Sequence, residues 1–462
     1  MDTITHGIAG ALLAKAIFRG EDMFGSRVDI VGKKTGATLR SSGQGARPAS
    51  PAGPGQAESG PYGPSLQRIV TWALMLGAIF PDSDVFRDIF SHDRLLVVTW
   101  HRSITHSLVL LPIWALLLAA LTHWFAKSKD WRLPAGVFRS RIFGVAFVAR
   151  VIDRWLAKKK EWEAPSFAAL SGIYAIGILS HILLDLVTTF GTMIWSPIEW
   201  SRPAWDLIFI IDFTLSAILL VPQLVAWVYS DPEKMWPRAM GTWLVFMPVP
   251  LVIARIAEAA GAPISAQTSL GVMLVLSIIF LLPAVRRWGL GVRYVAWNRC
   301  GFAAALIYVA LTFSAHRAAL ARIHKFAEMD HLQVDAIGAL PLPPSLWHWD
   351  GLVRGPRGVY ELRMDLSDTS ASGTDLLAQE HRYYPDAPPN SYIEAAKRLP
   401  EVQKVLWFAR FPVTRFHKEG EEAVVEIRDV RFAQMRGDRP SFTYRVRFGA
   451  DGNVLSQGWA TR

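Results

Sequence analysis

The chain has 462 residues, 51% of them hydrophobic, and its mean hydropathy is positive, at +0.23. Apolar runs long enough to cross a bilayer, such as Leu108–Ala126 and Leu207–Tyr229, exclude an ordinary soluble globular protein. The formal net charge of +10 does not indicate nucleic-acid binding, because the basic residues gather in loops between apolar runs. The single cysteine, Cys300, excludes an intrachain disulfide and a cysteine-based zinc cage.

The first part of the chain predicts a helical membrane domain, formed by residues 1–19 and 68–230. A short apolar helix follows His6, and residues 20–67 then turn rich in Gly, Pro, Ser and Ala, a composition that cannot bury a core and predicts a disordered insertion. A second short helix is expected to end at Pro81. Full-length spans follow at about 108–126, 166–190 and 207–229.

The second part predicts additional transmembrane helices over residues 231–324 and a C-terminal α+β domain over residues 325–462. The additional spans lie at about 239–257, 268–284 and 301–316. In the tail, the alternating segments Gly358–Met364 and Ala423–Arg428 predict strands. A Gly-rich turn between Ser441–Phe448 and Val454–Trp459 predicts a hairpin. One amphipathic helix is expected over Tyr392–Ala409. The predicted fold is therefore mainly α, a polytopic helical membrane bundle with a small C-terminal α+β domain.

The charges of the loops predict how the chain is inserted. The loop 127–163 carries ten Lys or Arg against four Asp or Glu. If each apolar run crosses once, all basic segments fall on one side, which the positive-inside rule makes cytoplasmic. The sequence thus predicts a multi-pass membrane protein, with its candidate site and its C-terminal domain on the extracytoplasmic side.

The strongest candidates for chemistry are His181 and Asp185, which lie four residues apart inside an apolar run. On a helix they share one face and can reach one ion, and an ionisable side chain inside a span is a functional candidate by default. The structural alternative is that His181 hydrogen-bonds to a neighbouring helix while Asp185 pairs with an arginine. Imidazole and carboxylate together favour Zn, Mn or Fe over Mg or Ca.

A second group of candidates precedes the span at 108–126. His101 and His106 are five residues apart, which separates them by roughly 140° on a continuous helix, so they converge only if the chain breaks before the span. Ser103 or Thr105 would then serve as the N-cap. Arg102 is either an interfacial anchor or a clamp for a phosphate or carboxylate.

The remaining candidates are weaker when taken singly. Asp82 and Asp84 follow Pro81 and point toward the same polar region, as metal ligands, as a general base, or simply as turn and cap residues. His6 is a ligand or an incidental histidine near a terminus. Four further residues are expected to support the site, and one of them is a carboxylate expected inside a span; they are Ser107, Thr188, Asp206 and Asp212.

Taken in order, these motifs resemble the bacterial YdjM/YfhP-like family, whose members are described as inner-membrane-bound, metal-dependent hydrolases. The likeness covers roughly residues 1–230 apart from the insertion, with two shorter matches in the tail. The segments that carry it are Met1–His6, Pro81–Asp84, His101–Ser107, Ser180–Asp185, Leu186–Gly191, Pro197, Trp205–Asp212, Arg410–Pro412 and Asp429–Phe432.

The family is in turn similar to the all-helical fold of zinc-dependent phospholipase C and single-strand nucleases, whose metals are held by His and Asp. The resemblance implies phosphoester hydrolysis with one or two divalent ions, most simply Zn, and with Mn or Fe as alternatives. The ligands it implies are His6, Asp82 or Asp84, His101, His106, His181 and Asp185. Arg102 would stabilise negative charge on a small-molecule or lipid substrate, and Asp84 or Asp82 is a ligand or general base.

Two other classes of protein remain open at this stage. An ion-coupled transporter would line its path with His181, Asp185 and Asp212, although the sequence shows no internal repeat. A membrane sensor or scaffold would present the C-terminal domain and dispense with the histidines.

Overall fold

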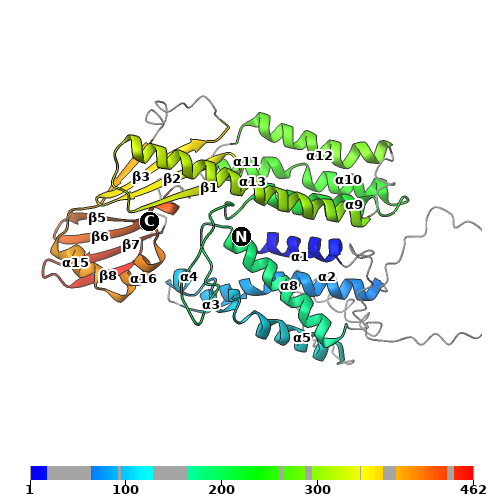
Figure 1. Cartoon of the computed structure of the whole chain (residues 1–462), viewed down its shortest axis with the longest axis horizontal. Coiled ribbons are helices and arrows are strands. Elements are labelled where there is room, and N and C mark those ends of the chain that lie inside the picture. Colours follow the sequence, from blue (N-terminus) through cyan, green and yellow to red (C-terminus); the bar gives the residue numbers. More distant parts are fainter. Residues whose placement is uncertain are drawn as a thin grey trace, which may run out of the picture.

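In the computed structural model of the chain, a bundle of helices carries two small antiparallel sheets at one end (Figure 1). The structure describes residues 2–17, 64–91, 95–127, 165–259, 264–286, 294–343, 345–367, 381–433 and 442–460. The expected disordered insertion and the basic loop at 127–163 therefore lie almost entirely outside the described residues.

The first half of the bundle surrounds α8. The helices α1, α2 and α5 pack against it or against one another, and short helical turns connect α2 to α5. The elements are α1 (Thr3–Ile17), α2 (Pro64–Ile79), the 3₁₀ turn η1 (Phe80–Asp84), α3 (Val85–Phe90), α4 (Leu96–Thr99), the 3₁₀ turn η2 (Ile104–His106), α5 (Leu111–Lys127) and α8 (Phe167–Leu186).

The second half of the bundle is built on α13, which packs along α9 and α1. Its helices are α9 (Phe213–Val228), α10 (Met235–Phe246), α11 (Val249–Ala259), α12 (Ala266–Arg286) and α13 (Tyr294–Met329). Within the described part of the chain, five helices are long and apolar enough to cross a bilayer, or six if the bent pair formed by 96–106 and 111–126 counts as one span.

Two four-stranded antiparallel sheets, each a meander in chain order, form the C-terminal region. The first contains β1 (Ala336–Leu342), β2 (His348–Gly355), β3 (Gly358–Asp365) and β4 (His381–Pro385). The second contains β5 (Pro412–Glu419), β6 (Glu422–Asp429), β7 (Thr443–Phe448) and β8 (Val454–Trp459), with α15 (Ser391–Lys397) and α16 (Pro400–Phe408) against it. The predicted hairpin is confirmed as β7 paired with β8.

Both sheets are anchored to the bundle by apolar packing. The end of α13 buries Ile323 and Phe326 against Trp349 on one face of the first sheet. The core of the second sheet includes Phe190, which belongs to the loop after α8. The C-terminal region is thus built onto one end of the bundle, and α13 runs without interruption across the expected boundary at 324/325.

Two expected boundaries were wrong for a local physical reason, and two other helices end close to where they were expected. The helix α2 ends at Ile79, just before Pro81 as expected, and the chain continues as the 3₁₀ turn η1, whose first positions accept a proline. The span expected from residue 207 begins only at Phe213, because Asp212 caps α9 by accepting hydrogen bonds from Thr214 N and Leu215 N. The helix expected over Tyr392–Ala409 is two helices, because Pro400 starts a new one. The span expected at 166–190 ends at Leu186.

Candidate metal centre

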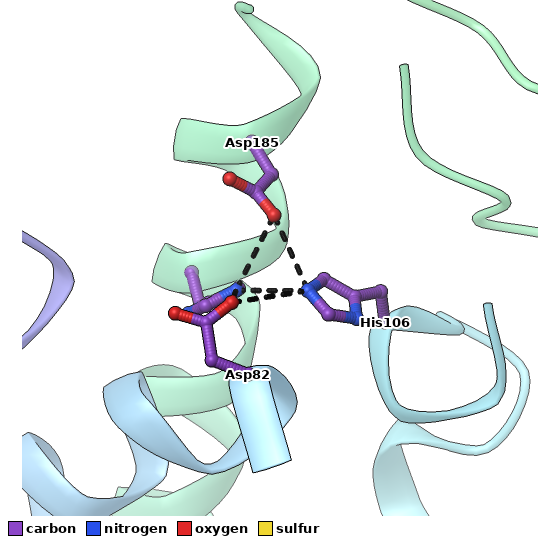
Figure 2. Close-up of side chains that lie close together, drawn as sticks. Asp82, His106 and Asp185 are labelled. Carbon is purple, nitrogen blue, oxygen red and sulfur yellow. Dashed lines mark hydrogen bonds and ion pairs between the residues drawn. The ribbon is translucent and has the colours of Figure 1, made fainter. Parts of the chain in front are cut away.

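Four side chains converge at the end of the bundle nearest the C-terminal region. Asp82 comes from η1, His106 from η2, and His181 and Asp185 from α8, and one possible ligand atom of each lies within 4.8 Å of the others. Figure 2 shows Asp82, His106 and Asp185 pointing toward one another. His106 Nε2 lies 3.2 Å from Asp185 Oδ2, and His181 Nε2 lies 3.5 Å from Asp82 Oδ1.

Close packing of α2 on α8 brings these residues together. A Cβ added to Gly177 would lie 2.7 Å from the carbonyl oxygen of Leu74 and 3.0 Å from Gly77 Cα. Small residues let helix backbones approach in this way. His181 lies one turn after Gly177 and donates its Nδ1–H to the carbonyl oxygen of Ala78 at 2.7 Å. The glycine contact therefore sets the spacing between the two helices that supply Asp82, His181 and Asp185.

The hydrogen bonds of the two imidazoles leave the same nitrogen facing the cluster. His181 Nδ1 is engaged by the Ala78 carbonyl, and His106 Nδ1 faces Thr105 Oγ1 at 3.1 Å and Asp84 Oδ2 at 3.4 Å. With both imidazoles neutral and their N–H on Nδ1, each Nε2 presents a lone pair. The two Nε2 atoms lie only 3.0 Å apart. Two lone pairs facing each other beside two carboxylates fit a shared cation, and the outer nitrogens are held as in metal-binding histidines.

His6 of α1 lies directly behind this group. Its ring stacks on His181 with 3.6 Å between centroids, and its Nε2 lies 3.1 Å from Asp185 Oδ1. His6 is completely buried, and its Nδ1 has no hydrogen-bond partner in the described part of the chain. Thr3, one turn earlier, donates to Asp82 Oδ2 at 2.6 Å. Thr3 lies in the N-terminal motif beside His6, but no pattern in the sequence marks it as part of the site.

Asp84 and His101 form a separate pair. His101 Nδ1 lies 3.0 Å from Asp84 Oδ1, and Asp84 Oδ2 accepts the backbone N–H of Arg102 at 2.8 Å. Neither belongs to the four-residue group found among the described residues. Asp84 is instead the residue that orients His106. The predicted break before α5 is present as a bend of 72°, but neither Ser103 nor Thr105 caps a helix through its side chain. Thr105 donates to Asp84 instead.

Arg102 is buried beside Asp185 and adopts a left-handed backbone conformation, with φ of 62°. Its Nη2 lies 3.0 Å from Asp185 Oδ1, and its Nη1 donates to Thr188 Oγ1 at 2.9 Å. Thr188 in turn donates to the Asp185 carbonyl. Both contacts of the structural alternative are therefore present, an arginine on Asp185 and a neighbouring helix on His181. These contacts involve Asp185 Oδ1 and His181 Nδ1. They therefore orient the two residues and leave Asp185 Oδ2 and the two Nε2 atoms facing the cluster.

The other three expected supporting residues act elsewhere. Ser107 donates to the Ser196 carbonyl and accepts the N–H groups of residues 109 and 110 at the start of α5. Asp206 holds Arg410 of the C-terminal region through two hydrogen bonds of 2.9 and 2.8 Å. Asp212, expected inside a span, caps α9 and accepts hydrogen bonds from Tyr308 and Ser345.

A second arginine, Arg202, was not predicted from the sequence and extends the positive charge toward the C-terminal region. Arg202 donates to the His101 carbonyl, and its guanidinium lies 5.0 Å from the ring centroid of Phe190. Burial, followed by the nearby charges of Arg102 and Arg431, lowers the pKa of Arg202 to about 9. The two buried guanidiniums offset the carboxylates of the cluster, and no spacing in the sequence signals that Arg202 reaches the His101 carbonyl.

These features define a class of protein, a helical membrane protein with a buried His/Asp cluster at one end of its bundle. Residues 49–262 match the family model described as YdjM inner membrane protein. The match spans Asp82, His106, His181 and Asp185, and it confirms the predicted resemblance to the YdjM family over this part of the chain. No curated protein and no solved structure matches the chain.

Proposed function

We propose that the protein is a multi-pass, metal-dependent hydrolase of the bacterial inner membrane that acts on a phosphoester or lipid-like substrate. The observation that carries the proposal is the 3.0 Å approach of His106 Nε2 to His181 Nε2 between two carboxylates. Without a cation or proton between them, two such nitrogens repel, whereas a metal ion makes the contact favourable.

The first ion would be held by the four-residue group of Asp82, His106, His181 and Asp185. A second ion, if present, would share Asp185 with His6, whose Nε2 faces the other carboxylate oxygen. Two histidines and two carboxylates suit Zn, and Mn or Fe bind similar sets. When bound, such an ion polarises a substrate oxygen and lowers the pKa of water toward neutrality.

The residues of the chain would position the reacting groups. Asp84 orients His106, and Arg102 and Thr188 hold Asp185. Arg102 has a buried Nε without a hydrogen-bond partner among the described residues. A guanidinium placed there is suited to stabilise negative charge that develops on a substrate.

The arrangement of the bundle supports placing the site on the extracytoplasmic side. The start of α1, the end of α2 and the end of α8 lie together near the C-terminal region (Figure 1). The loop charges predict that this end of the bundle faces the side of the membrane opposite the basic segments. A substrate would then reach the site from the outer membrane–water boundary.

Metal content tests this proposal. The wild type, His181→Ala and Asp185→Asn would be purified in detergent, and bound metal measured by mass spectrometry. His348→Ala is the control, since His348 is a partly exposed histidine of β2 that pairs with Asp365 and lies outside the ligand group. We expect about one or two ions in the wild type and the control and at least about a tenfold loss of affinity in the two variants. Equal metal content in all four proteins would refute the metal site.

Hydrolysis is tested with the same proteins. We expect metal-dependent cleavage of bis(4-nitrophenyl) phosphate by the wild type and the control, and its loss in the two variants. Transport of the substrate across the membrane without hydrolysis would refute the enzyme and favour a carrier.

A further inference from the structure

An apolar groove of about 790 Å³ runs along the outside of the bundle and reaches the candidate metal centre. The helices α2 and α5 form its walls, and Tyr174 of α8 contributes to its lining. Trp72 and Leu76 line it from α2, and Leu121 and Phe125 from α5. Its volume falls within the range of small-molecule binding pockets.

One end of the groove is formed by residues of the metal centre. Asp82 lines the groove and also belongs to the four-residue ligand group, and Thr3, which donates to Asp82, lines it too. From Ile69 on α2 to Asp82 in η1 the groove follows the chain for about 20 Å, at about 1.5 Å per residue. That length is comparable to one leaflet of a bilayer, whose two leaflets measure about 30 Å together.

The lining indicates what occupies the groove. Trp72, Leu76 and Leu121 are about half exposed, at 49%, 50% and 50%. The wall formed by α2 belongs to a helix long and apolar enough to cross a membrane, and α5 belongs to the bent pair that can count as one span. A hollow of this kind in a bilayer faces acyl chains, and a polar solute gains nothing from it. The carboxylate of Asp82 at the end of the groove instead requires a polar group. The occupant must therefore be amphipathic, with an apolar chain and a polar group at Asp82.

We propose that the groove binds one acyl chain of a membrane lipid and places the phosphoester of its headgroup at the metal centre. This inference rests on the proposed hydrolase and specifies its substrate class. In the reaction, the oxygen of a water molecule bonds to phosphorus while the bond from phosphorus to the leaving alcohol oxygen breaks. One proton of the water goes to that oxygen, and the other is released.

Binding is tested apart from hydrolysis by photo-crosslinking. The full chain in nanodiscs of phosphatidylglycerol would receive a phosphatidylglycerol with a diazirine in one acyl chain, and crosslinked peptides would be mapped by mass spectrometry. Leu121→Trp and Leu76→Trp fill the groove from its two walls. Leu274→Trp is the matched control, because Leu274 of α12 is 62% exposed and lies outside the groove.

We expect crosslinks on α2 and α5 in the wild type and the control, and at least about a tenfold loss in both groove variants. The rate of lipid hydrolysis relative to that of bis(4-nitrophenyl) phosphate should fall about tenfold in the same two variants. Crosslinks that persist in both groove variants, or a ratio that stays constant, would overturn the inference. Groove-dependent crosslinks in a protein that binds metal but cleaves neither substrate would overturn the hydrolase and leave the lipid site standing.

Discussion

Replacing Gly177 by alanine should weaken metal binding although Gly177 is not itself a ligand. The glycine faces α2 where the two helices are closest, and a Cβ there would lie 2.7 Å from the Leu74 carbonyl oxygen. The atoms that it meets are backbone, so no side chain can rotate away. The helices α2 and α8 must separate, or the end of α8 must shift.

The size of the shift can be worked out from the contact. Ordinary van der Waals contact begins near 3.4 Å, so the methyl group is about 0.7 Å too close. Metal–ligand distances tolerate only about 0.2 Å. His181 lies one turn after Gly177, and Asp82 lies in η1, which directly follows the opposing helix α2. The separation therefore acts directly on the distance between ligands, and we expect about a 10- to 100-fold loss of metal affinity and about 1–3 kcal/mol of destabilisation.

Gly172→Ala is a matched control on the same helix, because nothing lies within 4 Å of a Cβ at Gly172. Both variants would be purified in detergent, and metal affinity measured by competition with a chelator alongside thermal unfolding of the metal-free protein. Gly172→Ala should bind metal as the wild type does and gain up to about 1 kcal/mol from helix propensity. The same metal affinity for both variants would refute the view that helix spacing builds the site.

Three further predictions concern the C-terminal region. Burial, together with the nearby charge of Glu361, raises the pKa of Asp350 to about 7. The folded state then binds more protons than the unfolded state between about pH 4 and 7, so the free energy of unfolding should fall by up to about 4 kcal/mol as the pH rises through that window. Urea titrations of Asp350→Asn should lack this fall, and an equal fall in that variant would contradict the assignment. Arg410→Ala leaves the buried Asp206 without its paired guanidinium and should lower stability by about 2 kcal/mol. The control Arg415→Ala, on an exposed part of β5, should change stability by under about 0.5 kcal/mol. Equal effects of the two substitutions would refute the pairing. A periplasm-active reporter fused to the C-terminus should be active in cells, and activity of a cytoplasm-active reporter instead would overturn the proposed orientation.

The parts of the site that follow from helix geometry could be predicted from the sequence. His181 and Asp185 share one face of α8 as their spacing predicts, and the spacing of His101 and His106 required the break that the structure shows before α5. The sequence could not separate Asp82 from Asp84, because the 3₁₀ turn that contains Pro81 directs one carboxylate to the cluster and the other to His101.

The contacts that no periodicity reveals come from tertiary packing. Asp212 lies at the edge of an apolar run, and a sequence pattern cannot tell a buried carboxylate inside a span from one that caps the helix and binds Tyr308. The long helix α13 likewise hides its double role, since its apolar residues serve the bundle first and then the sheet. Propensity marks the helix, and its partners are decided by packing.

The C-terminal region contacts the loop between α8 and α9 at several points. The loop between α8 and α9 contains Thr188 and Phe190, and both contact Arg102. The C-terminal region holds the same loop through Arg431, which donates to the Thr189 carbonyl at 3.0 Å, and through Arg410 on Asp206. Because Arg102 reaches Asp185, a chain of direct contacts joins the second sheet to the ligand cluster. Displacing the second sheet should therefore disturb the metal centre itself, which a separately tethered domain would not do.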